Sequence, residues 1–230
     1  MKDRRSNSKG RDTLPTTKGQ AALPVGWQCK PLGECAGFMS GSTPSLNNAA
    51  FWSGEFPWVT ARDMKALRID STARRISELG KAVAAVAPAQ SVLVLTRGMT
   101  LFKDLPVCIA EREMAFNQDV KALIPASDLD ASFLAYQLLA NKREILQMVD
   151  TAGHGTGRLD TQLLKDLPFA FPPLPEQRRI ARILATWDRA LVNTERLIDK
   201  LHAEKNALMA DLLTGTRRVS VRHKEPMDAA

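Results

Sequence analysis

The sequence predicts an α+β fold, in which one mixed domain is followed by one long coiled-coil helix. Two observations lead to this prediction. Short apolar segments alternate with polar turns from Leu23 to Phe171, which is typical of short strands mixed with a few helices. Beyond Pro175, large apolar residues recur at intervals of three and four, and no glycine or proline occurs from Glu176 to Thr214. That spacing is typical of a coiled coil.

The same patterns divide the chain into four segments. Residues 1–22 carry six Lys or Arg against two acidic residues and few large apolar side chains, so we expect a disordered basic tail. Residues 23–171 form the mixed domain, residues 172–215 the long helix, and residues 216–230 a flexible tail.

Several elements of the mixed domain can be placed from local patterns. Apolar runs predict strands at Ser91–Thr96, Pro106–Ala110 and Val120–Ile124. Asp130 is a suitable N-cap for a helix that we expect to run to about Val149. The glycine-rich segment 153–157 predicts a flexible loop, and Trp58 is expected in the core rather than as a stacking platform.

The long helix has a narrow apolar stripe, called the seam below. Its nine positions are Leu184, Trp187, Leu191, Thr194, Ile198, Leu201, Lys205, Leu208 and Leu212. About 38 residues would extend roughly 57 Å at 1.5 Å per residue. A helix of this length needs a partner, and self-association into a homodimer is the economical solution. Thr194 and Lys205 would then influence the register. The alternative is a helix that packs back on its own domain.

Composition excludes some classes of protein and leaves others open. The net charge is +7, but residues 23–171 carry fifteen basic and fifteen acidic residues, so charge alone does not establish nucleic-acid binding. No apolar run is long enough to span a membrane, and the polar start of the chain does not resemble a secretion signal. The three cysteines lack paired metal-ligand spacing. We expect reduced thiols, no metal and a cytoplasmic location.

No catalytic site is expected from the motifs. The segment 153–157 is rich in glycine but lacks the Gly-Lys-Ser/Thr ending of a phosphate-binding loop. Pro172-Pro173 is not preceded by the Asp or Asn found in aminomethyltransferases. The histidines are scattered, and His154 is more simply explained as a surface residue than as a base or ligand.

Several motifs in order resemble the specificity subunit of type I restriction–modification systems. The most specific is the segment 171–180, Phe-Pro-Pro-Leu-Pro-Glu-Gln-Arg-Arg-Ile, which leads into the heptad helix and its Leu-Leu-Thr-Gly end at 212–215. Upstream elements similar to the family's target recognition domain are Leu23-Pro24, Gly26-Trp27, Gly41-Ser42-Thr43-Pro44, Pro57-Trp58-Val59-Thr60, Thr96-Arg97-Gly98, Phe116-Asn117-Gln118-Asp119 and Gly155-Thr156-Gly157-Arg158-Leu159. The resemblance covers about Leu23 to Val219.

The sequence departs from the family pattern in two ways. Family members usually carry two recognition domains and two such helices, whereas this sequence has one set and resembles a half-sized form. A further glycine often follows the pair Arg97-Gly98 in the family, but Met99 to Lys103 follow here.

The resemblance implies a DNA-recognition subunit without catalytic residues. Two chains would dimerise through the helix and read a symmetric, bipartite target in double-stranded DNA. Its partners would be type I methyltransferase subunits and, where one is present, the motor-nuclease subunit. No cofactor is expected on this chain, because S-adenosylmethionine would be bound by the methyltransferase.

Candidate DNA contacts follow from the matched motifs and from side-chain chemistry. Hydroxyl and backbone N–H groups of Ser42, Thr43, Gly155 and Thr156 suit phosphate oxygens, and Thr60 belongs to a matched motif. Basic side chains that suit phosphate or guanine are Arg97, Lys121 and Arg158. Asn117 and Gln118 have the amide geometry to read adenine, although holding a loop is an equally good explanation.

Two other functions remain open from the sequence. One is a regulatory or structural half-subunit that dimerises with, or competes against, a full specificity subunit without reading DNA. The other is an enzyme in its own right, such as a nuclease or methyltransferase, which is disfavoured because its motifs are missing.

Overall fold

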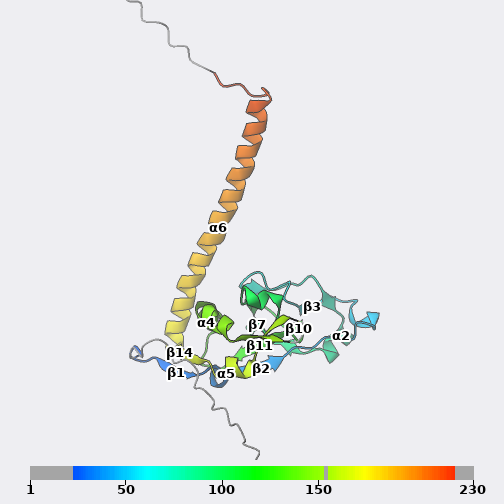
Figure 1. The fold of residues 1–230 in the computed structure, drawn as a ribbon, viewed down its shortest axis with the longest axis vertical. Helices are drawn as coiled ribbons and strands as arrows, with labels where there is room; N and C mark the ends of the chain where they lie inside the picture. Colours follow the sequence, from blue (N-terminus) through cyan, green and yellow to red (C-terminus); the bar gives the residue numbers. More distant parts are fainter. Residues whose placement is uncertain (1–22, 153–154, 221–230) are drawn as a thin grey trace, which may run out of the picture. The chain divides into compact units, whose positions relative to one another are not determined.

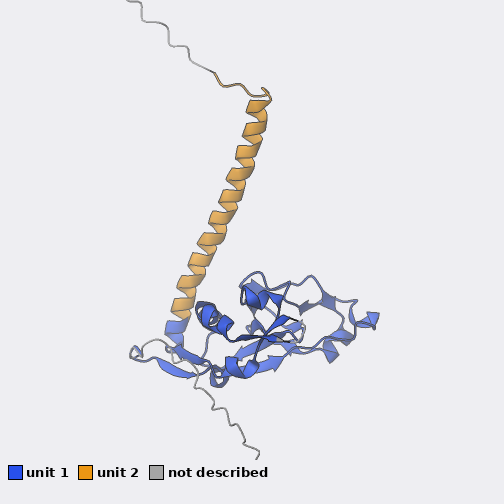
Figure 2. Ribbon diagram, in the orientation of Figure 1, with its two compact units in different colours: residues 1–177 blue, residues 178–230 orange. Residues whose placement is uncertain are grey.

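The chain divides into two compact units, residues 1–177 and residues 178–230 (Figure 2). The computed structural model describes residues 23–152 and 155–220. The predicted basic tail, residues 1–22, lies outside the described residues, as do residues 221–230 of the predicted C-terminal tail. Residues 216–220 form no regular element.

The largest sheet of unit 1 has the strand order β2-β11-β7-β9-β4 (Figure 1). Its strands are β2 (Ala36–Ser40), β11 (Val120–Pro125), β7 (Val92–Leu95), β9 (Val107–Ala110) and β4 (Arg68–Ile69). All neighbours are antiparallel except β4 and β9. Strands β7, β9 and β11 confirm the three predicted apolar strands. The continuous apolar runs of β7 and β9 fit a buried central position, where neither side of a strand faces water.

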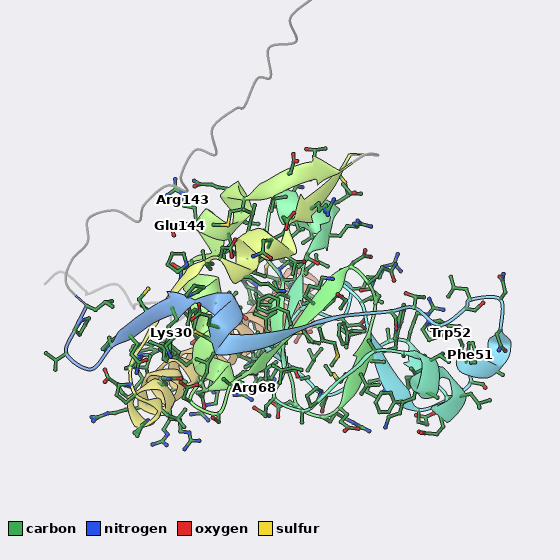
Figure 3. All side chains as sticks on the ribbon, turned by 90° about the horizontal axis from the view of Figure 1, so that it is seen from below. Lys30, Phe51, Trp52, Arg68, Arg143 and Glu144 are labelled. Atoms are coloured by element: carbon green, nitrogen blue, oxygen red, sulfur yellow. The ribbon has the colours of Figure 1, made fainter. Side chains whose placement is uncertain are left out.

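A second, smaller sheet has its own core. Its order is β5-β3-β10-β6, with β5 (Arg75–Ile76), β3 (Phe56–Val59), β10 (Met114–Phe116) and β6 (Val86–Ala87). Beside it lie α2 (Glu78–Val83) and the 3₁₀ turn η1 (Ala49–Phe51). Trp58 is buried in this core, as predicted. The Trp52 ring packs edge-on against the Trp58 ring, with 4.9 Å between the ring centroids. Phe51 and Trp52 lie at the end of unit 1 remote from Lys30 and Arg143 (Figure 3).

The third sheet consists of a hairpin of two strands and a short strand that comes soon after β7 in the chain. Its order is β12-β13-β8, with β12 (Val149–Ala152), β13 (Thr156–Leu159) and β8 (Arg97–Gly98). The prediction of a loop over residues 153–157 was therefore too long, because Thr156 and Gly157 pair with β12. Gly153 and His154 lie outside the described residues. A Cβ on Gly157 would lie 3.0 Å from Leu101 Cβ, so glycine allows β13 to approach the next turn closely.

The single helix predicted from Asp130 to Val149 is wrong. Asp130 does cap α3 (Ala131–Ala140), since its carboxylate accepts hydrogen bonds from the N–H groups of Ser132 and Phe133. The helix ends at Asn141, whose side-chain amide donates to the carbonyl of Gln137 at 3.0 Å. A shorter helix, α4 (Lys142–Gln147), follows, and Val149 begins β12. The Asn141 backbone, with φ of −90° and ψ of 9°, departs from helical values and separates the two helices.

Three further short elements and a strand pair complete unit 1. Strand β1 (Gln28–Pro31) pairs antiparallel with β14 (Pro168–Phe171). The helices α1 (Leu32–Cys35) and α5 (Thr161–Lys165) contact each other, and the 3₁₀ turn η2 (Met99–Phe102) packs on β13.

The long helix α6 (Leu174–Leu213) has 40 residues, about 60 Å at 1.5 Å per residue. It starts in unit 1 and continues through unit 2. Gly215, with φ of +76°, follows its end, where the sequence predicted the stop. The observed mixed fold followed by a long helix confirms the predicted α+β class.

Candidate nucleic-acid interface

A polar cleft in unit 1 brings together residues from separate parts of the chain. Its volume is about 230 Å³, and its lining residues are Thr96, Arg97, Gln118, Lys121, Arg158, Leu159 and Thr161. They come from β8 and the residue that precedes it, β11, β13, the start of α5 and the turn before β11. Four of them, Arg97, Gln118, Lys121 and Arg158, are candidate DNA contacts from the sequence.

The two arginines of the cleft lie on paired strands. Arg158 of β13 lies directly opposite Arg97 of β8 in the antiparallel register. Both side chains are exposed, and within the described residues no salt bridge to either is found. Like charges directly opposite each other destabilise a sheet. A bound anion such as a DNA phosphate would remove this repulsion.

Lys121 adds a third positive charge to the cleft. Partial burial lowers the pKa of the Lys121 ammonium, and the positive charges of Arg97 and Lys165 lower it further. Its Nζ donates a hydrogen bond to Ser40 Oγ at 2.7 Å and forms no ion pair among the described residues. The cleft therefore concentrates positive charge in a domain whose composition is electrically balanced.

The turn before β11 separates the roles of Asn117 and Gln118. The Asn117 amide donates to the Asp119 carboxylate at 3.0 Å, and Thr96 N–H and hydroxyl both donate to the Asp119 carbonyl. Asn117 is thus engaged in holding the turn. Gln118 is exposed in the cleft, and its Oε1 accepts a hydrogen bond from the Thr43 hydroxyl.

The other candidate hydroxyls lie outside the cleft lining. Ser42 Oγ accepts from the Ala85 N–H at 2.8 Å, and the Ser42 carbonyl accepts from the Trp58 indole. Thr60 Oγ1 donates to the Asp63 carboxylate at 2.8 Å. In this structure these two residues bond to the protein itself. Thr43 contacts one residue of the cleft, Gln118, through the hydrogen bond described above.

The two candidates at the hairpin differ in their surroundings. Gly155 has φ of +75°, and a Cβ there would meet nothing within 4 Å. Thr156 is half-buried at the start of β13, two residues before Arg158. Neither is in the cleft lining.

Sequence reasoning missed three polar residues around this site. Thr96 and Thr161 line the cleft, and Lys165 acts electrostatically on Lys121. Thr96 stands beside Arg97 in a matched motif, which is a signal that could have identified it. Thr161 and Lys165 belong to a short helix whose position depends on the folded chain.

The seam residues form a second candidate surface, on unit 2. The large apolar members Leu184, Trp187, Leu191, Ile198, Leu201, Leu208 and Leu212 are all exposed. Trp187 and Leu191 are the most exposed, at 67% and 60%. The polar members Thr194 and Lys205 are exposed as well, and Thr194 Oγ1 donates to the Ala190 carbonyl at 2.8 Å.

Metal sites and membrane spans are not found in the described part of the chain. Residues 23–152 and 155–220 hold no group of three or more His, Cys, Asp or Glu side chains that could hold a metal ion. Within these limits no helix is both long and apolar enough to cross a membrane. Cys29, Cys35 and Cys108 are free thiols.

Comparison with known proteins gives a consistent family. Residues 24–203 match the model of the type I restriction modification DNA specificity domain. The chain is 30% identical over 162 residues to the EcoR124I/EcoR124II specificity subunit of Escherichia coli, covering 69% of this chain and 40% of that protein. It is 26% identical over 193 residues to the MjaIX specificity subunit of Methanocaldococcus jannaschii, covering 79% and 43%.

Solved structures show the same fold. A chain of a type I restriction–modification system superimposes with a TM-score of 0.66 at 24% identity, covering 84% of this chain and 46% of its own length. The HsdS subunit from Thermoanaerobacter tengcongensis gives a TM-score of 0.62 at 22% identity, covering 85% and 46%. The chain therefore spans less than half the length of these relatives.

Proposed function

The chain belongs to the family of type I restriction–modification DNA specificity domains, and from this premise we propose that it recognises DNA sequence for a methyltransferase. The observation that carries the proposal is the concentration of Arg97, Lys121 and Arg158 in one cleft without acidic partners among the described residues. Double-stranded DNA is the polyanion that the family membership implies. Phosphate contacts of this kind position a protein on the duplex.

In this proposal some residues of the cleft position the protein on the DNA, and another reads a base. Arg97 and Arg158 project from neighbouring strands and would straddle one or two phosphates. Gln118 presents an amide at the edge of the same cleft, where it would meet a base edge. Asn117 would support Gln118 by holding the turn, because its amide is bonded to Asp119.

The seam of α6 would carry the second part of the function. A second copy of the chain would cover the exposed apolar stripe, because a heptad pattern on one copy is complementary to the same pattern on another. An antiparallel pair would place a recognition domain at each end, since each domain precedes its helix in the chain. Such a homodimer would read a symmetric, bipartite target, with the helix pair setting the spacing.

Catalysis would belong to the partners. Type I methyltransferase subunits would bind S-adenosylmethionine and modify the target base, which they reach by base flipping. A motor-nuclease subunit would join the complex in systems that contain one. This chain would supply the sequence specificity and no catalytic residue.

Salt-dependent DNA binding tests the role of the cleft. The full chain with its methyltransferase subunits is titrated with a fluorescent duplex of about 30 bp at several salt concentrations. We expect the double variant Arg97→Gln/Arg158→Gln to bind at least about 10-fold more weakly at moderate salt. The slope of log affinity against log salt should become shallower by about 0.9 for each phosphate that the variant no longer neutralises.

The matched control is Arg112→Gln, which removes an exposed arginine that lies outside the cleft lining. It should bind DNA like the wild type. An equal weakening in both variants, or none in the double variant, would mean that the cleft is not the phosphate-binding surface. If the chain were instead a half-subunit that does not read DNA, both variants should assemble with the methyltransferase subunits like the wild type. Neither variant should then change DNA binding.

A further inference from the structure

The short turn η2 (Met99–Phe102) places apolar side chains at the surface next to the basic cleft. Met99 is 63% exposed and Phe102 is 47% exposed, whereas Leu101 between them is 1% exposed. In a 3₁₀ helix, residues three apart lie on the same face because each turn takes three residues. Met99 and Phe102 therefore share one outward face, called the η2 face below.

The buried side of η2 anchors this turn to the domain. Leu101 packs against β13, where a Cβ on Gly157 would lie only 3.0 Å from Leu101 Cβ. Gly98, which precedes the turn, has φ of 147° and ψ of 164°. This region is essentially restricted to glycine, so the connection from β8 to η2 requires Gly98. The η2 face is held in place by a buried leucine and a constrained glycine.

The η2 face lies next to a cleft residue in the chain. Arg97 lines the cleft and precedes Met99 by two residues, so their Cα atoms are at most about 7.6 Å apart. On the other side Lys103 is exposed. The next acidic residue, Asp104, is paired with Lys142, with Nζ 2.7 Å from the carboxylate. Positive charges therefore flank the two apolar side chains along the chain. The nearby carboxylate of Asp104 is already neutralised by Lys142.

We propose that the η2 face contacts bases in the major groove and reads thymine through its 5-methyl group. This inference rests on the proposed DNA recognition. Charges on both sides of the apolar pair fit phosphates on both sides of a groove. Among the groups that base pairs display at their groove edges, the thymine methyl is the apolar one. Met99 and Phe102 have the matching chemistry, and the polar residues of the cleft do not.

Binding of modified duplexes tests the assignment. The target is first identified as the sequence methylated in the presence of this chain. Affinity is then measured for a duplex with that target, for the same duplex with scrambled target, and for versions with uracil in place of individual thymines. In the wild type we expect at least one uracil substitution to weaken binding about 4-fold, because uracil differs from thymine only by the missing methyl group, whose burial contributes about 0.8 kcal/mol.

The variants Phe102→Ala and Met99→Ala should lose this discrimination. Phe102→Ala should reduce the preference for target over scrambled duplex about 10-fold. It should bind the thymine and uracil duplexes equally, and keep the wild-type salt slope, since the contacts to phosphates stay in place. The matched control Leu79→Ala removes an exposed leucine on α2 and should change none of these values.

Other outcomes would overturn the proposal. A target without thymine, or uracil duplexes that bind the wild type like thymine duplexes, would exclude methyl reading. A Phe102→Ala variant with normal discrimination but impaired assembly with the methyltransferase subunits would make the η2 face a protein-docking surface. If the wild type prefers no duplex over its scrambled version, the proposed DNA recognition itself fails, which is a distinguishable result.

Discussion

Arg158 lies directly opposite Arg97 in the antiparallel pairing of β13 with β8. Adjacent arginines without an intervening acid lower the stability of a sheet, and functional sites commonly carry features of this kind. Folding alone does not explain this pair, whereas the proposed contact with DNA phosphates would offset its repulsion.

Replacing one member of this pair should stabilise the free protein. We expect Arg158→Gln to raise the free energy of unfolding by up to about 1 kcal/mol, because a cross-strand repulsion is removed. Urea denaturation of wild type and variant measures the difference. Arg112→Gln is the control and should change stability by less than about 0.5 kcal/mol. A clear loss of stability in Arg158→Gln would show that the arginine has a structural partner instead.

Gln177 is a buried polar residue at the first turn of α6, and it should contribute strongly to stability. Its side chain accepts a hydrogen bond from the Asp130 N–H at 2.8 Å and donates to the carbonyls of Asp128 and Pro172 at 2.9 and 2.8 Å. Gln177→Ala leaves these buried groups without partners, so the free energy of unfolding should fall by about 3 kcal/mol.

The matched control for Gln177 is Gln162→Ala. Gln162 is exposed, and its amide donates to the Asp166 carboxylate at 2.8 Å on the protein surface. Water can replace this bond, so we expect a decrease below about 0.5 kcal/mol by urea denaturation. Equal effects of the two substitutions would contradict the anchoring role of Gln177.

The three cysteines should differ in their reaction with a thiol reagent. Burial raises the pKa of the Cys108 thiol to about 12, with a smaller contribution from Asp63. Burial raises the pKa of Cys35 as well, whereas Cys29 is exposed. The thiolate is the reactive form, so at a pH of about 8 we expect iodoacetamide to modify Cys29 in the folded protein.

Mass spectrometry of digested protein identifies the modified cysteines. After denaturation in urea all three should react, because burial no longer disfavours the thiolate. Rapid modification of Cys108 in the folded state would contradict its position in the central strand β9.

The proposed homodimer depends on the seam of α6. In Leu191→Glu/Leu201→Glu two charges would be buried in an apolar contact, so the mass in solution should fall from twice the 25.3 kDa of the chain to that of one chain. Light scattering measures this mass. The control Asn193→Glu/Asn206→Glu adds the same charge at outer positions of the same helix and should remain dimeric. A double seam variant with the wild-type mass would exclude the seam as the interface.

Local patterns predicted the elements whose signal lies within one segment. The runs at Ser91–Thr96 and Val120–Ile124 became central strands, Asp130 capped a helix, and the heptad segment became α6. The continuation of the first helix to Val149 was wrong because apolar spacing does not reveal the non-helical backbone of Asn141. Strands of two residues, such as β8, carry too little pattern to be predicted.

The site depends on contacts between distant segments, which limits what its sequence reveals. Arg97, Lys121 and Arg158 are each visible as basic residues in or beside matched motifs. Their convergence follows from the pairing of β13 with β8 and from the turn of Asn117 to Asp119 against Thr96. The η2 face was visible only as a departure from the family pattern, because the burial of Leu101 decides which side chains point outward.

The proposed role of this chain is to determine which DNA sequence a methyltransferase modifies. Sequencing of methylated bases in cells that express the methyltransferase subunits, with and without this chain, measures that role in the cell. We predict that a new methylated motif appears only with the chain, that the motif is an interrupted palindrome, and that Arg97→Gln/Arg158→Gln abolishes it. An unchanged pattern of methylation in the presence of the chain would contradict this role.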